Sequence, residues 1–385
     1  MAVDFEAIRP YHDHEVAPVL QRLLRDEAFL QTLARYRFPR LTDYCAPLLR
    51  RLIAWRLGRE VRGIDSVAAL QERIEPYVDR VVERATAGIS YSGLEQLDDQ
   101  QAYLYLANHR DIVMDPAFVN YAVYHAGLPT PRIAIGDNLL QKPFVSDLMR
   151  LNKSFIVHRS ITNRREKLSA FQTLSAYINH SIAEGHSIWI AQAEGRAKDG
   201  DDATDAAILK MFHMSRKDQP FAEVIGSLNL VPVSISYEYD PCDVAKAREL
   251  ETRARTGSYH KQAGEDDHSI ALGITGHKGR VHLAFNRLNG ADYADAKALA
   301  QACDQLILGH YKLFPVHYLA WERWAERDAA LPVPSAASLF SASELAAAEQ
   351  ELGKRLAQCS AAEQPFLLMQ YATPVRNQYR LQQNR

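Results

Sequence analysis

The sequence lacks the features that mark several large classes of protein. Its 385 residues include only four cysteines, which lie far apart, and none shows the CxxC or Cys/His spacing of a zinc site. No disulfide framework is evident, so a reducing cytoplasm is the expected compartment. The formal net charge is −2, so the chain has no overall basic field of the kind that favours binding to nucleic acid.

Long apolar runs are also missing. No window reaches the roughly 18 consecutive apolar residues that a membrane-spanning helix requires. The N-terminus does not resemble a signal peptide, because four acids interrupt what would be its apolar core: Asp4, Glu6, Asp13 and Glu15. We therefore expect a soluble protein or one that lies on a membrane surface. The sequence has no Gly-x-Ser-x-Gly motif, which argues against a serine hydrolase.

The pattern of apolar residues changes at about residue 89. Three segments within residues 16–88 space their apolar residues as helices do, which predicts a helical N-terminal block over 1–88. From residue 89, short apolar runs alternate with helical stretches, which predicts an α/β fold with a mixed central sheet flanked by helices. The predicted strands lie within 88–97, 101–108, 131–137, 154–159, 187–195, 230–238 and 280–286, and the predicted helices within 115–127, 138–151, 163–184 and 204–217.

The last third of the chain is mainly helical and polar. A charged helix, DVAKARELETRAR, precedes a predicted polar loop at 257–269. A Pro/Ser linker at 331–338 leads to a helix that Ser341 and Glu344 would begin as a capping box. We thus predict three parts: a helical region at 1–88, a main α/β domain at 89–330, and a linker with a helical tail at 331–385.

Polar side chains follow several of the predicted strands. In open α/β sheets ligands bind outside the carboxyl ends of the strands, so these residues are candidates for a site. They are Asn108-His109-Arg110-Asp111 after the second strand, His158-Arg159 after the fourth, Glu194-Gly195-Arg196 and Lys198 after the fifth, and Glu238 and Asp240 after the sixth. Any one group is explained by the chain reaching the surface; their recurrence at one end favours a site.

His109 is the first candidate for a chemical role. A histidine titrates near neutral pH and can take a proton from a hydroxyl group. A nearby carboxylate would fix its tautomer and stabilise the imidazolium, and both Asp111 and Asp115 are close enough in sequence. The alternative interpretation is a solvated His–Asp pair in a loop.

Arg159 and Arg196 are candidates for binding an anion. Guanidinium groups hold phosphate through two parallel hydrogen bonds. Gly195 would let the backbone approach a ligand closely, and Glu194 would accept a hydrogen bond from a substrate hydroxyl. A surface salt bridge is the alternative for each arginine.

Four segments, taken in order, resemble the motifs of the glycerolipid acyltransferases, meaning the glycerol-3-phosphate and 1-acylglycerol-3-phosphate acyltransferases. The segments are NHRDIVMD at 108–115, DNLLQKPFVSDLMRLNKSFIVHR at 137–159, AEGRAKDG at 193–200 and NLVPVSISYE at 229–238. The resemblance covers about residues 89–290, so it implies that 89–330 is a catalytic domain with the fold of that family.

The sequence departs from the family pattern at three places. Five residues, rather than four, separate His109 from Asp115, so Asp111 is an alternative partner, although the MDP context favours Asp115. Arg196 follows Gly195 directly, so Arg196 or Lys198 would hold the phosphate. The helix before Arg159 starts at 137–138, where many relatives have a lysine. These departures indicate a divergent subfamily.

The resemblance also implies a mechanism and its substrates. His109, oriented by Asp115, would deprotonate an acceptor hydroxyl, which would attack the thioester of acyl-CoA or acyl-carrier protein. The acceptor would be glycerol-3-phosphate or a lysophospholipid, held by the implied substrate-binding residues Arg110, Arg159, Glu194, Gly195, Arg196 and Lys198. No cofactor or metal is implied, because the acyl carrier is a substrate.

Alternatives to this function remain at the level of sequence. One is acyl transfer to another acceptor, such as an amino-acid lipid or a sugar, which the altered third motif favours. Another is an inactive lipid-binding homologue, supported only by the unusual His–Asp spacing.

A membrane contact is a separate expectation. The segment 38–61 combines apolar faces, Trp55 and several arginines. Such a segment either packs on the catalytic domain or lies in a membrane interface with anionic lipid. The arginines lead us to expect peripheral contact with the inner face of the membrane.

Overall fold

The fold is described from a computed structural model, which covers residues 3–262 and 264–383. Contacts divide the chain into two compact units: unit 1 comprises residues 1–78 and 131–177, and unit 2 comprises residues 79–130 and 178–385. The division into three parts at residues 88 and 330 stays a prediction. No helix in the described ranges is both long and apolar enough to span a bilayer.

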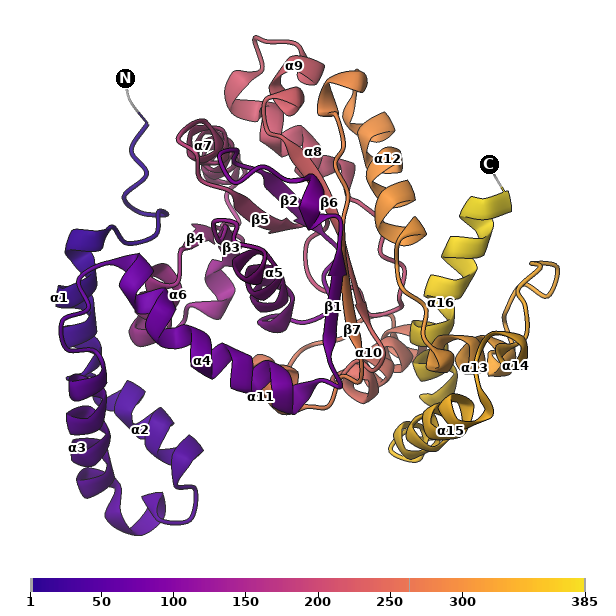
Figure 1. The fold of residues 1–385 in the computed structure, drawn as a ribbon, viewed down its shortest axis with the longest axis horizontal. Coiled ribbons are helices and arrows are strands. Elements are labelled where there is room, and N and C mark those ends of the chain that lie inside the picture. Colours follow the sequence, from indigo (N-terminus) through magenta and orange to yellow (C-terminus); the bar gives the residue numbers. More distant parts are fainter. Residues whose placement is uncertain (1–2, 263, 384–385) are drawn as a thin grey trace. The chain divides into compact units, whose positions relative to one another are not determined.

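Unit 1 contains the predicted helical block, followed by a pair of strands with their helices (Figure 1). The first predicted helical segment, VAPVLQRLLRDEAFLQTLARY at 16–36, is broken at Asp26, whose side chain accepts a hydrogen bond from Phe29 N and so begins a new helix. The predicted helix at 138–151 begins only at Pro143. The elements are α1 Asp13–Leu23, α2 Glu27–Arg37, α3 Thr42–Glu60, α4 Val67–Ala85, β3 Arg132–Gly136, the 3₁₀ turn η2 Asp137–Leu139, α6 Pro143–Leu151, β4 Ser154–Val157 and α7 Arg164–Ala183, with α4 and α7 running past the unit boundaries.

The core of unit 1 joins α1 and α4 to α6. The buried apolar residues of this cluster are Val16, Val19, Leu20, Leu23, Ile64, Val67, Leu70, Phe144 and Leu151. A buried carboxylate, Asp147 of α6, accepts hydrogen bonds from Tyr11 and Arg22 and fastens α1 to the same place. β3 and β4 pair in parallel, as expected for strands joined by a helix.

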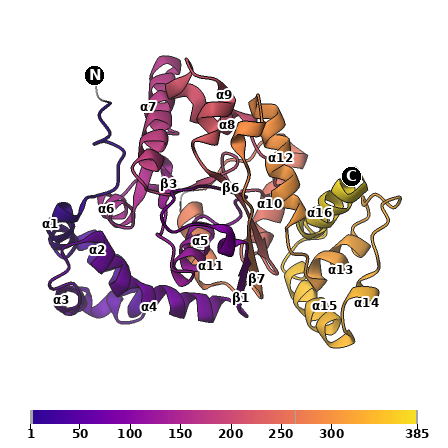
Figure 2. The ribbon, with the colours of Figure 1, turned by 45° about the horizontal axis from the view of Figure 1, so that its top comes forward.

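Unit 2 contains five strands in the order β1-β7-β6-β2-β5 (Figures 1 and 2). The β6–β7 pair is antiparallel and the other pairs are parallel, so the sheet is mixed, as predicted. Because β2, β5 and β6 are parallel, their carboxyl ends meet at one edge. The strands are β1 Ile89–Ser92, β2 Leu104–Ala107, β5 Ile188–Ala191, β6 Leu230–Tyr237 and β7 Val281–Phe285.

Helices cover both faces of this sheet. On one face, Tyr237 of β6 packs against Phe118 of α5. The neighbouring Ser236 points to the opposite face. There its hydroxyl accepts a hydrogen bond from Lys312 N, just beyond α12, which packs on β6. The longer helices of unit 2 are α5 Met114–His125, α8 Ala206–His213, α9 Phe221–Gly226, α10 Asp243–Thr256, α11 Glu265–Thr275, α12 Ala296–Gly309, α13 Pro315–Arg323, α15 Ala342–Leu356 and α16 Gln364–Gln383.

The last helices form their own apolar cluster. The short helix α14 Ala336–Leu339 lies in the predicted linker, and Leu331 and Ala336 are buried with α13, α15 and α16. Ser341 and Glu344 form the predicted capping box of α15. The prediction of a loop over 257–269 was wrong in its second half, because α11 begins at Glu265. Three acids in its first turn, Glu265, Asp266 and Asp267, complement the positive end of the helix dipole.

The turn after β1 generates a stability prediction. Gly93 has φ of +86°, and a Cβ there would lie 1.9 Å from the backbone oxygen of Phe285. We expect Gly93→Ala to lower the free energy of unfolding by about 3 kcal/mol or more, because the left-handed backbone is strained and the β7 backbone must move. Gly185→Ala is the matched control: φ there is +83° with nothing within 4 Å of a Cβ, so the cost should be about 1–2 kcal/mol. Urea unfolding of both variants measures the difference, and equal costs would contradict the predicted clash.

Candidate active site

The edge where β2, β5 and β6 end carries the predicted polar residues. Asn108, directly after β2, is buried and replaces a backbone partner of β6. Its side-chain oxygen accepts a hydrogen bond from Ile235 N at 2.7 Å, and its amide donates to Ile235 O at 3.0 Å. The next residue, His109, is thereby held just beyond the edge of the sheet.

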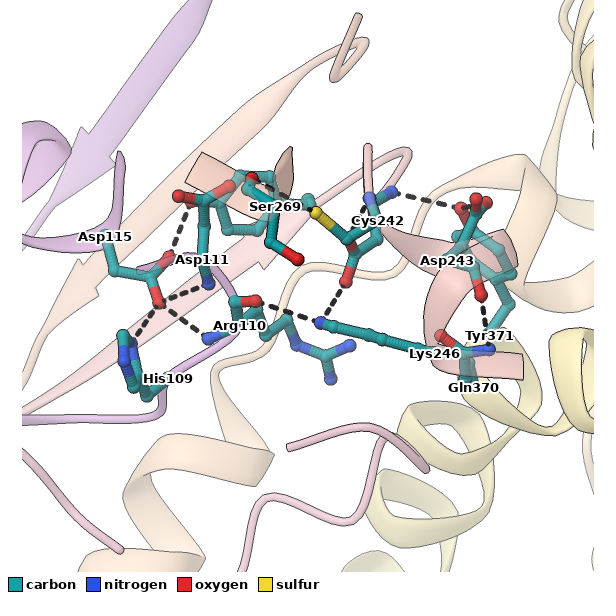
Figure 3. A network of polar contacts seen from close by, with 12 residues as sticks. His109, Arg110, Asp111, Asp115, Cys242, Asp243, Lys246, Ser269, Gln370 and Tyr371 are labelled. Carbon is teal, nitrogen blue, oxygen red and sulfur yellow. Dashed lines mark hydrogen bonds and ion pairs between the residues drawn. The ribbon is translucent and has the colours of Figure 1, made fainter. Parts of the chain in front are cut away.

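His109 is paired with Asp115 on the first turn of α5. The distance from His109 Nδ1 to Asp115 Oδ2 is 2.8 Å. The same oxygen accepts the backbone N–H groups of Arg110 at 2.6 Å and Asp111 at 2.9 Å, and Oδ1 accepts the hydroxyl of Tyr237 at 2.5 Å. Figure 3 shows three of these four contacts converging on one carboxylate, which is fully buried. The four donors satisfy both oxygens of the buried carboxylate.

Tyr237 keeps its proton in this arrangement. Burial and the charge of Asp115 raise the pKa of the Tyr237 hydroxyl well above its ordinary value, so the hydroxyl donates. With Nδ1 of His109 donating to the carboxylate, Nε2 is left as the proton acceptor. The His109 ring also stands edge to face against Trp189 of β5, with ring centroids 5.7 Å apart. The imidazole is therefore fixed both by a hydrogen bond and by packing.

Asp111, the other candidate partner of His109, has a different role. Its Oδ1 accepts the backbone N–H groups of Val113 and Met114, at 3.0 and 2.9 Å, and so closes the turn that leads into α5. Its Oδ2 is buried with no hydrogen-bond partner among the described residues. Burial and the nearby Asp115 raise the pKa of Asp111. The extra residue between His109 and Asp115 is accommodated in this turn.

Arg110 points into the interior of unit 2. Its guanidinium lies 2.6 Å from Asp202 and stacks over the ring of Tyr311, 4.9 Å from the centroid. Both Arg110 and Asp202 are buried. The structure therefore gives Arg110 internal partners, and its predicted contact with substrate stays a prediction.

The loop after β5 forms one wall of a small cleft beside His109. The cleft has a volume of about 110 Å³, and Glu194, Gly195 and Arg196 line it together with His109. Gly195 has φ of +83°, a conformation that favours glycine. Ala197 N donates to His109 O at 2.8 Å, which ties the loop to the segment that follows β2. The first and third sequence motifs thus meet, as their position after neighbouring strands predicted.

The cations predicted to bind phosphate differ in their surroundings. Arg196 lines the cleft and is half-buried. Lys198 forms a close ion pair with Glu249, which also binds Arg253 at 2.6 Å. Burial lowers the pKa of Lys198, although Glu249 opposes that shift. Arg159 follows β4 in unit 1, where its backbone N–H donates to Asp137 Oδ1 at 3.1 Å. Which of the three binds phosphate stays a prediction.

Three residues of the site were missed in the sequence. Tyr237 ends a strand that was recognised, but nothing local shows that its hydroxyl reaches Asp115. Asp202 lies in a run of acids that is typical of a solvated loop. Lys246 lies on a helix so rich in charge that it reads as exposed, yet it is buried. Their roles depend on contacts between segments 92–136 residues apart in the chain.

The segments that form this site are similar in sequence to known proteins. Residues 88–236 match the family model described as Acyltransferase. The chain is 24% identical over 287 residues to a glycerol-3-phosphate acyltransferase of Pseudoalteromonas translucida, an alignment that covers 70% of this chain and 30% of the relative. It is 27% identical over 180 residues to a glycerol-3-phosphate acyltransferase of Shewanella amazonensis, covering 46% and 21%. The alignments thus span less than a third of the length of these curated relatives.

A solved structure is also similar. The crystal structure of the 1-acyl-sn-glycerophosphate acyltransferase from Thermotoga maritima is 14% identical, with a TM-score of 0.39. The match covers 72% of this chain and 92% of that one.

The geometry predicts opposite effects for the two acids. Because the folded state raises the pKa of Asp111, ionisation of this group costs stability as pH rises above its ordinary value of 3.8. Asp111→Asn keeps the oxygen that caps α5 but removes the charge, so the variant should gain stability relative to wild type between pH 4 and pH 8. Asp115→Asn should instead lose about 1–3 kcal/mol at pH 8, because its amide cannot accept all four donors. Urea unfolding at several pH values measures both. A stability of Asp111→Asn that falls relative to wild type with rising pH would show that the Asp111 anion is stabilised.

Proposed function

We propose that this chain is a glycerolipid acyltransferase, which transfers a fatty acyl group to a hydroxyl of glycerol-3-phosphate or a lysophospholipid; the match of residues 88–236 to the Acyltransferase family model supports this proposal. The donor in this proposal is acyl-CoA or acyl-carrier protein. The observation that carries it is the His109–Asp115 pair, fully hydrogen-bonded at the carboxylate and open to a cleft at the imidazole.

The proposed step is a direct transfer. Nε2 of His109 takes the proton of the acceptor hydroxyl while the oxygen attacks the thioester carbonyl carbon. The new ester C–O bond forms, the C–S bond breaks, and the thiolate leaves with the proton that His109 returns. Asp115 stabilises the imidazolium in between, and it can do so without relaxation because its hydrogen bonds already exist. The step as written needs only the two substrates.

The acceptor is expected to bind along the loop after β5. Arg196 lines the cleft beside His109, and Glu194 in the same loop is exposed and placed to accept a hydroxyl hydrogen bond. Lys198 is already engaged by Glu249, so Arg196 is the better candidate for the phosphate in this unit.

The first test is acyl transfer by the purified protein. Labelled acyl-CoA and acyl-carrier protein would each be offered with glycerol-3-phosphate, lysophosphatidate, other lysophospholipids and a lyso amino-acid lipid. We expect one phosphorylated glycerol or lysophospholipid acceptor to be acylated, and His109→Ala to lose at least about a hundredfold in kcat. His310→Ala, which removes an exposed histidine at the end of α12, is the matched control and should keep wild-type activity.

Other outcomes would redirect the proposal. Acylation of only the amino-acid lipid would support the alternative acceptor class. Transfer that His109→Ala leaves intact would show that His109 is not the base, and no transfer to any acceptor would favour a lipid-binding protein.

The structure also supports the expected membrane contact, through a face of α3 in unit 1. α2 and α3 pack against each other (Figure 1), yet α3 leaves a row of large apolar side chains in solvent. Tyr44, Leu48 and Trp55 are 86%, 68% and 60% exposed. The spacing of seven residues places Leu48 and Trp55 on one side of the helix, and Tyr44 lies just before a kink at Cys45. This row, with the half-exposed Leu52, is called the α3 face below.

Arginines surround the α3 face. Residues 35–59 contain seven arginines and a single acid, Asp43, although the chain as a whole is slightly negative. Arg51, Arg56 and Arg59 are exposed on α3, and Arg59 stacks on the Trp55 ring at 5.1 Å. Exposed aromatic and aliphatic groups beside arginines are typical of a helix that lies in an anionic membrane interface. The lipidic substrate and product of the proposed reaction give this contact a purpose at the inner face of the membrane.

Vesicle binding tests the α3 face. We expect wild type to sediment with phosphatidylglycerol vesicles more than with phosphatidylcholine vesicles, and less at high salt. The variant Tyr44→Ser/Leu48→Ser/Trp55→Ser should bind at least about tenfold more weakly, because three inserted apolar groups are lost. The control Tyr91→Ser/Tyr124→Ser/Leu339→Ser removes three exposed apolar groups elsewhere and should bind normally. Equal binding by both triple variants would exclude the α3 face.

A further inference from the structure

A buried lysine contacts the segment that holds His109. Lys246 lies on α10, outside the matched family segment, and is 3% exposed. Its Nζ donates to the backbone oxygen of Arg110 at 2.9 Å (Figure 3). It also donates to Asp240 Oδ2 at 2.5 Å. A lysine is rarely buried unless it is paired, and here one of its partners is backbone from the candidate active site.

The bond to Arg110 O has a geometric consequence. That oxygen belongs to the same peptide unit as the N–H of Asp111, which donates to Asp115 Oδ2 at 2.9 Å. The C=O and N–H of a trans peptide point in opposite directions. The amide between Arg110 and Asp111 is therefore held at one end by a cation and at the other by the carboxylate that orients His109. In a dry interior such a chain of hydrogen bonds polarises each member.

The lysine is itself fixed by Asp240. Asp240 Oδ1 accepts Cys242 N at 2.8 Å, its backbone N–H donates to Tyr371 at 3.0 Å, and its backbone oxygen accepts Arg355 at 2.8 Å. Burial would raise the pKa of Asp240, but the charge and hydrogen bond of Lys246 and the N–H of Cys242 lower it overall, so the ion pair is kept.

The start of α10 is fastened to the last two helices. Asp243 Oδ2 accepts Arg355 of α15 at 2.8 Å and the hydroxyl of Tyr371 of α16 at 2.6 Å. Gln370, also on α16, donates to the backbone oxygen of Asp243 at 3.1 Å. All of these groups are buried in unit 2. Lys246 is therefore held in place by contacts between α10 and two helices, α15 and α16, that carry none of the family motifs.

We propose that Lys246 is a positioning residue: by fixing the Arg110–Asp111 amide it holds Asp115, and through it the His109 imidazole, in the geometry for proton transfer. Its effect on activity rests on the proposed function. The competing explanation is that Lys246 only neutralises the buried Asp240. That explanation predicts a loss of stability but no change in the position of His109.

The test is Lys246→Met, which keeps the length of the side chain and removes its donor and charge. We expect kcat to fall about 10- to 100-fold, since a small displacement of a catalytic group costs that much. KM for the acceptor should change less than about threefold, because no substrate contact is lost. In parallel, NMR of protein with ¹⁵N-labelled histidine reads the Nδ1 proton of His109 directly, assigned by its disappearance in His109→Ala. That resonance should move or broaden in Lys246→Met.

Arg280→Met is the matched control. Arg280 pairs with Glu238, a buried carboxylate at the end of β6, through bonds of 3.0 and 2.8 Å. This variant also leaves a buried carboxylate without its cation, but the Arg280 side chain is 41% exposed, so its thermal stability should fall less than that of Lys246→Met. It has no contact with residues 109–115 among the interactions of the described chain, so its kcat and the His109 resonance should match wild type.

The outcomes are distinct. If Lys246→Met has the same kcat and the same His109 resonance as Arg280→Met, the proposal is overturned and the lysine is only a counter-ion.

If Lys246→Met does not fold, Lys246→Arg is tested in its place, since this variant retains the charge pair. A planar guanidinium cannot place one N–H at the same point on the carbonyl, so kcat should fall at least about fivefold at unchanged melting temperature. Wild-type kcat in Lys246→Arg would overturn the proposal. If wild type itself transfers no acyl group, the proposed function fails, and the His109 resonance alone decides the role of Lys246.

Discussion

The buried carboxylate of Asp115 is the group around which the candidate site is built. A carboxylate without water is stable only when its oxygens are satisfied, and here the imidazole, two backbone amides and a phenol supply four hydrogen bonds. These donors come from three places in the sequence: the turn after β2, the histidine that precedes it, and the end of β6. The polar residues that follow β2 thus satisfy one buried carboxylate and hold the His109 imidazole against it.

Much of this was readable in the sequence, and the reasons are physical. The strands could be predicted because each is a short apolar run that ends in polar residues or glycine. The meeting of His109 with the loop at 194–196 followed from parallel strands whose carboxyl ends share an edge. The capping box at Ser341 is a purely local pattern, and it formed as predicted.

What could not be predicted has equally definite causes. Asp111 and Asp115 are both within reach of His109, and only the course of the turn into α5 decides between them. Lys246 is one charged residue among many on α10, and a helical pattern cannot show which charges face a neighbouring backbone oxygen 136 positions away. The break at Asp26 depends on a side chain that caps α2, and the apolar spacing of the segment hides it. The helix at 265–275 is supported by acids at its positive end, and its sequence has no clear apolar period. The position of Arg159 depends on a unit whose core is separate from that of His109.

The contacts of Asp243 with Arg355 and Tyr371 show that the part of the chain that folds together extends beyond the segment that matches the family model. The match to the family model described as Acyltransferase ends at residue 236, before β7 has completed the sheet and before α10 begins. A fragment cut at that boundary would contain every recognisable motif, and yet it would lack the supports beneath the amide that faces Asp115. Even a cut at residue 330 would strand Asp243 as a buried anion without its guanidinium and phenol. The smallest portion of this chain able to fold with the candidate site in place is therefore larger than the match to the family model, and the C-terminal helices belong to it.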